Sequence, residues 1–183
     1  MSTTVETETV TTYLRPIDSE GLAAFAEKGR NNPQARGTNK VRTVLEGQYR
    51  SLSYVGNHDA VVVDEPLHLF GQDTAPAPGE IVLSALGGCL AVGITAVATA
   101  RNVRLSKLEL FLEGDIGNPA AWGAGGAEKK PEDMGFQDIR VSVAVEGDAS
   151  REELDKIVTD ANFYSPVANT MRNPIAFKIG LAH

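Results

Sequence analysis

The chain has 183 residues, a formal net charge of −7 and one cysteine. A chain of this length can bury a core of its own and corresponds to one domain. No stretch concentrates lysine and arginine into a basic stripe, so nucleic-acid binding is not expected. The first twelve residues are polar and acidic and lack the basic start and apolar run of a signal peptide, which favours a cytoplasmic location.

The first predicted elements are a helix and three strands. Asp18 or Ser19 is a suitable N-cap for a short helix over Glu20 to Lys28. Three extended segments separated by turn residues follow and predict an antiparallel meander: 41–47, 48–56 and 60–66. We therefore divide the chain into an N-terminal arm with a short helix, residues 1–40, and a domain, residues 41–183.

A glycine- and proline-rich loop then leads into a long apolar run. The elements predicted after that run are, in order, a strand at 108–114, a polar loop at 117–134, a strand at 136–145, a helix from 151, a short helix from 166 and a strand at 175–182. Ser150 starts the first of these helices with a capping box, Ser-Arg-Glu-Glu. This order predicts an α+β fold with antiparallel sheets around a long central helix.

The apolar run covers residues 81–100 and carries no charge. It is long enough to span a bilayer, but it is rich in Ala, Gly, Ser and Thr and has no aromatic belt or basic flank. We therefore expect no membrane contact and predict a soluble core helix, buried on every side. Small residues recur along it at three- and four-residue steps and would let another helix approach closely: Ala85, Cys89, Gly93, Ala96 and Ala100.

Cys89 is the only cysteine, so it cannot form an internal disulfide or a multi-thiolate metal site. Any redox or nucleophilic chemistry through sulfur must use this one atom. Alternatively, Cys89 is an inert buried residue, because free cysteine often behaves as a small hydrophobe.

The residues around Cys89 resemble those of a known family. The run APGEIVLSALGGC at 77–89, the Asp-Glu-Pro at 64–66 and the Ser-Pro-Val-Ala-Asn-Thr at 165–170 are similar to the OsmC/Ohr family of osmotically induced and organic-hydroperoxide-resistance proteins. The resemblance implies an intertwined homodimer with the central helices at its heart and the active sites at the interface. It also implies that a thiolate, matched by Cys89, attacks the O–O bond of an organic hydroperoxide.

Two residues of the family's mechanism differ here. The second cysteine, which resolves the sulfenic acid in better-known members, is Ser165 in this chain, so an external thiol would have to reduce Cys89 directly. The glutamate expected directly after the proline is Gly79, and Glu80 follows one position later.

The activating arginine of the family is also replaced. No arginine lies between Arg50 and Arg101, and counting back along the connection to the apolar run reaches His68. A Cys–His pair can form a thiolate and an imidazolium, so His68 is a candidate partner of Cys89, with Glu80 as a further catalytic candidate. Alternatively, His68 is a solvated loop residue.

Aromatic residues and Ser165 are candidates for binding a small apolar substrate next to Cys89, although such aromatics are also common in plain cores. These candidates are Phe70, Trp122, Phe163, Tyr164 and Ser165. No cofactor is expected, and His58 and His68 lack the spacing of a zinc motif.

The sequence thus predicts a single-cysteine, thiol-dependent reduction of organic hydroperoxides, with an external thiol as reductant. Two alternatives stay open at this point. One is acyl or sulfur transfer, or hydrolysis, by Cys89 and possibly His68. The other is a redox-silent protein that binds small molecules.

Overall fold

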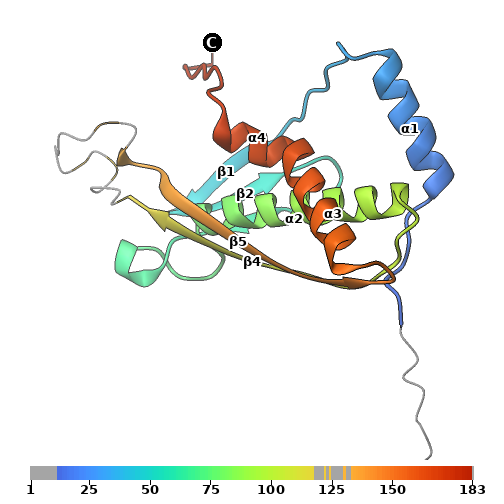
Figure 1. The fold of residues 1–183 in the computed structure, drawn as a ribbon. Coiled ribbons are helices and arrows are strands. Elements are labelled where there is room, and N and C mark those ends of the chain that lie inside the picture. Colours follow the sequence, from blue (N-terminus) through green and yellow to red (C-terminus); the bar gives the residue numbers. More distant parts are fainter. Residues whose placement is uncertain (1–11, 118–121, 123, 125–129, 131–132, 183) are drawn as a thin grey trace, which may run out of the picture. The chain divides into compact units, whose positions relative to one another are not determined.

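The computed structural model describes residues 12–117, 122, 124, 130 and 133–182. Its elements are, in chain order, α1 (Ser19–Asn31), β1 (Arg42–Gly47), β2 (Arg50–Tyr54), β3 (Val61–Val63), the 3-10 helix η1 (Leu67–Leu69), α2 (Pro78–Ala100), β4 (Leu105–Ile116), β5 (Phe136–Gly147), α3 (Arg151–Tyr164) and α4 (Pro166–Arg172), as Figure 1 shows. The predicted α+β fold with antiparallel sheets and a long helix is confirmed.

The chain divides into two compact units. The first contains 1–27, 90–110 and 143–183, and the second contains 28–89 and 111–142. Four elements run from one unit into the other: α1, α2, β4 and β5. The predicted boundary between an arm and a domain at residue 40 stays a prediction.

The second unit contains a three-stranded antiparallel sheet in the order β1-β2-β3. Val44 lies opposite Leu52, and Ser51 lies opposite Val63, so β2 is the central strand. The predicted meander is therefore confirmed. A separate two-stranded sheet consists of β4 and β5.

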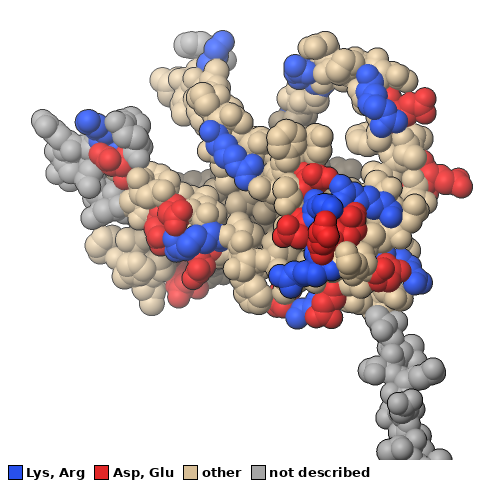
Figure 2. Space-filling model, viewed as in Figure 1, with Lys and Arg blue, Asp and Glu red and all other residues tan. Residues whose placement is uncertain are grey.

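The core of the first unit forms where α2, α3 and the start of β4 meet. Its buried side chains are Ile94, Ala98, Leu105, Leu154, Ile157 and Ala161. At the end of α2, Arg101 donates to Glu153 at 2.8 Å and also pairs with Asp160, and both carboxylates belong to α3. Figure 2 shows the same mixing of charges on the visible face, where basic and acidic side chains lie beside one another.

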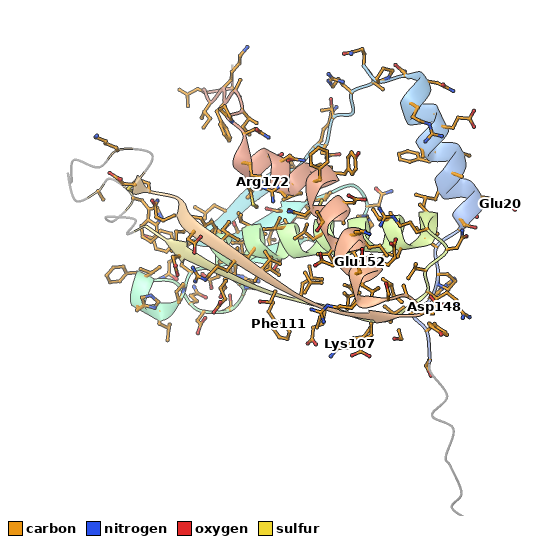
Figure 3. The ribbon with its side chains drawn as sticks, in the orientation of Figure 1. Glu20, Lys107, Phe111, Asp148, Glu152 and Arg172 are labelled. Atoms are coloured by element: carbon orange, nitrogen blue, oxygen red, sulfur yellow. The ribbon has the colours of Figure 1, made fainter. Side chains whose placement is uncertain are left out.

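The chain segment before α1 is anchored on β4. The Leu14 N–H donates to the carbonyl of Leu105 at 2.7 Å, and the Arg104 guanidinium stacks 4.2 Å from the centre of the Tyr13 ring. Asp148, labelled in Figure 3, accepts from Arg104 Nε at 2.7 Å. Lys107 and Phe111 extend from the exposed side of β4 in the same view.

The predicted helix caps are confirmed. Ser150 Oγ accepts from the Glu153 N–H at 3.2 Å and starts α3. Asp18 Oδ1 accepts from the Glu20 N–H at 3.1 Å at the start of α1. The short helix predicted from residue 166 is α4.

The prediction that the central helix is buried on every side is wrong for the single chain. Leu86, Leu90, Ile94 and Ala98 are buried, and their four-residue spacing places them on one stripe of α2. Val92, on another side, is 71 % exposed. Among the described helices α2 is long and apolar enough to cross a membrane, a property that the core helix of a soluble protein shares.

The predicted last strand is also wrong for the single chain. Residues 173–182 have no regular structure and are exposed, and Ile179 and Leu181 are each more than nine-tenths exposed. A strand is held by hydrogen bonds to a neighbouring strand, and no described strand pairs with this segment.

The small-residue side of α2 does admit another helix, as the sequence predicted. An added Cβ on Gly93 would lie 3.4 Å from the Cβ of Ala161, so α3 of the same chain packs directly on this glycine. This contact between Gly93 of α2 and Ala161 of α3 lies in the core of the first unit.

We expect Gly93→Leu to destabilise the chain by about 1–3 kcal/mol, because the new side chain overpacks the contact with α3. Urea unfolding followed by circular dichroism measures this change. Gly88→Leu is the matched control, because an added Cβ there meets no atom within 4 Å. Equal unfolding midpoints for Gly93→Leu and the wild type would contradict the packing.

Candidate functional site

Cys89 lies in the middle of α2, half-buried and next to the buried Leu90. Two residues earlier, an added Cβ on Gly87 would lie 3.0 Å from Leu112 Cδ1 of β4. A glycine at this position therefore lets the β4 side chain lie directly against the helix. Cys89 is partly exposed in the single chain, and both its catalytic role and the alternative of an inert cysteine stay predictions.

The start of α2 is stabilised by Glu80. Glu80 Oε2 accepts from the Ala77 N–H at 2.8 Å, which is the back-bonding half of a capping box, and Pro78 occupies the first helical position. In an α-helix, nine residues correspond to about 14 Å along the axis and half a turn around it. Glu80 and Cys89 therefore point to different sides of α2, and a catalytic role of Glu80 stays a prediction.

A loop closed by a buried carboxylate connects β3 to α2. Asp64 is completely buried, and its Oδ1 accepts from the Glu65 N–H at 2.8 Å and from the Gln72 N–H at 3.4 Å. Its Oδ2 accepts from the Thr74 N–H at 3.1 Å and from the Thr74 hydroxyl at 2.8 Å. One side chain thus holds both ends of the loop together.

Arg50 connects this loop to the sheet. Its Nη1 donates to the Thr74 hydroxyl at 2.9 Å, and its Nε pairs with Glu46 at 2.8 Å. The sequence places no arginine in the connection between β3 and α2, but the structure brings the Arg50 guanidinium to it from β2. Sequence reasoning missed both Asp64 and Arg50, because only tertiary contacts place them against Thr74.

The hydrogen bonds decide the charge of Asp64. Burial by itself raises the pKa of this carboxyl, but the bonds from the Thr74 hydroxyl and from the backbone of Thr74, Glu65 and Gln72 outweigh it and lower the pKa to about 2. Asp64 is therefore ionised at neutral pH although it is buried.

The loop displays His68 and Phe70 on the 3-10 turn η1. The turn is closed by bonds from the Leu69 and Gly71 N–H groups to the Pro66 carbonyl, at 2.9 and 3.2 Å. His68 is exposed, in agreement with the alternative of a solvated loop residue, and Phe70 is 79 % exposed. Phe70 also has a left-handed backbone with φ of 66°.

Glu65 interacts electrostatically with Glu80 and His68. Burial raises the pKa of the Glu65 carboxyl, the negative charges of Asp64 and Glu80 raise it further, and His68 opposes them. His68 and Glu80, two of the predicted catalytic residues, thus change the pKa of Glu65, a residue that the sequence analysis did not select. The role of His68 toward Cys89 stays a prediction.

Three of the four predicted aromatic residues lie in ring–ring contacts. Trp122 contacts Tyr49 of the β1–β2 turn with ring centroids 5.4 Å apart, and both belong to the second unit. Phe163 and Tyr164 of the first unit meet edge to face at 4.9 Å. Together with Phe70, all the predicted aromatics are at least half exposed, so they form no core within the single chain, and their role in substrate binding stays a prediction.

Ser165 has a structural role of its own. Only 2 % of it is exposed, and its Oγ accepts from the Ala168 N–H at 3.2 Å as the N-cap of α4. Among the described residues, no group of three or more His, Cys, Asp or Glu side chains is arranged to hold a metal ion.

The elements described so far define a class of protein: an α+β chain in which a long apolar helix carries a single half-buried cysteine. A family model described as OsmC-like protein matches residues 71–180, which include Cys89, Glu80 and Ser165. The chain belongs to the OsmC-like protein family. A search of curated proteins found no match.

Solved structures share the fold at low sequence identity. An OsmC-like protein from Mycoplasma pneumoniae has a TM-score of 0.62 and 16% identity, covering 75% of this chain and 89% of its own. An organic hydroperoxide resistance protein OsmC from Legionella pneumophila has a TM-score of 0.53 and 16% identity, covering 76% and 92%. An organic hydroperoxide resistance protein from Elizabethkingia anophelis, with thiocyanate bound, has a TM-score of 0.58 and 15% identity, covering 76% and 91%.

We expect the contribution of Asp64 to stability to depend on pH. The folded-state pKa of about 2 is below the usual 3.8, so the ionised carboxylate stabilises the fold above pH 3.8. That contribution is lost as the pH falls toward 2. Asp64→Asn should therefore unfold at lower urea concentration than the wild type at pH 7, and the difference should shrink between pH 4 and pH 2. A difference that does not change with pH would contradict the assignment.

Proposed function

We propose that this protein reduces organic hydroperoxides, with Cys89 as its only redox-active thiol. The observation that carries the proposal is the half-buried Cys89 on α2, inside the segment that the family model matches. Two solved structures with the same fold are named organic hydroperoxide resistance proteins, which supports the choice of substrate.

The first step oxidises Cys89. Its thiolate attacks one peroxide oxygen, the S–O bond forms and the O–O bond breaks. The remaining oxygen takes a proton and leaves with its organic group as an alcohol. Cys89 becomes a sulfenic acid, and the hydroperoxide is reduced by two electrons.

The second step regenerates the thiol and needs an external dithiol. One sulfur of the dithiol condenses with the sulfenic acid, which releases water and forms a mixed disulfide. The other sulfur attacks that disulfide, so Cys89 leaves as a thiol and the dithiol leaves oxidised. External thiol groups are required because the chain has no second cysteine, and a dithiol supplies both of them in one molecule. Cytoplasm supplies such reductants, and we propose this location.

We further propose that the functional form is an intertwined homodimer. The single chain exposes large apolar side chains on α2 and along its C-terminal segment, among them Val92, Phe177, Ile179 and Leu181. Apolar surface of this extent is typical of a protein–protein interface. The alternation of Ile175, Phe177, Ile179 and Leu181 is typical of a strand, and a second copy would supply the missing neighbour.

The activity prediction concerns Cys89 directly. We expect the wild type to consume cumene hydroperoxide in the presence of dithiothreitol, and faster than hydrogen peroxide, because apolar side chains bind the organic group. Cys89→Ser should abolish turnover, because a hydroxyl does not replace the thiolate. Mass spectrometry after one equivalent of oxidant should find one added oxygen on Cys89 in the wild type and none in the variant.

Two controls separate chemistry from folding. Circular dichroism should be the same for Cys89→Ser and the wild type, because the two side chains differ little in volume. Equal and slow rates with both peroxides, close to those of free cysteine, would reject the peroxidase. A reactive Cys89 with such rates would favour acyl or sulfur transfer, and an unreactive one would favour a binding protein.

The assembly prediction concerns the C-terminal segment. Light scattering should give the mass of two chains for the wild type at micromolar concentration. Ile179→Asp should shift the protein toward the monomer, because it places a charge in a buried contact. Lys178→Asp is the matched control, since the neighbouring side chain of an extended segment points the opposite way. A folded wild-type monomer at this concentration would reject the dimer.

A further inference from the structure

We draw no further inference here: the strongest candidate, the exposed apolar side of helix α1 around Phe25, lies before the residues that the family model matches, and nothing in the described part of the chain shows what covers it.

Discussion

The buried carboxylate of Asp64 is the interaction on which the second unit depends. A carboxylate without water is stable only if hydrogen bonds replace its hydration, and here four donors from Glu65, Gln72 and Thr74 do so. The same four hydrogen bonds that stabilise the carboxylate also close the loop that leads into α2. Arg50 reaches the same site, because it donates to the Thr74 hydroxyl that binds Asp64.

The second constraint is the apolar character of α2. One stripe of the helix, from Leu86 to Ala98, is buried within the single chain, and Gly93 lets α3 pack on it. The remaining sides are as free of charge as the buried one but lie partly in solvent. This surface of α2 and the apolar C-terminal segment are both exposed in the single chain. A second copy of the chain would bury both.

The chain belongs to the OsmC-like family, yet the groups around its cysteine differ from those that the resemblance implies. Ser165 caps α4 and occupies the place of a second thiol, and Glu80 caps α2. Both residues therefore stabilise helix starts, which is a structural role separate from catalysis. Asp64, Glu65 and the Arg50 that reaches Thr74 belong to the loop and sheet before α2.

The sequence by itself determined the local structure: the caps at Asp18 and Ser150, the meander, the long helix and the family motif that ends at Cys89 are all short-range patterns of hydrogen bonding and hydrophobicity. Only the tertiary structure decided which side of α2 is buried, that residues 175–182 find no strand partner within the chain, and that Asp64, Thr74 and Arg50 meet. The physical reason is that the burial of a side chain and the hydrogen bonding of a buried charge depend on groups distant in sequence. A helix cap or the alternation of a strand depends on a few neighbouring residues.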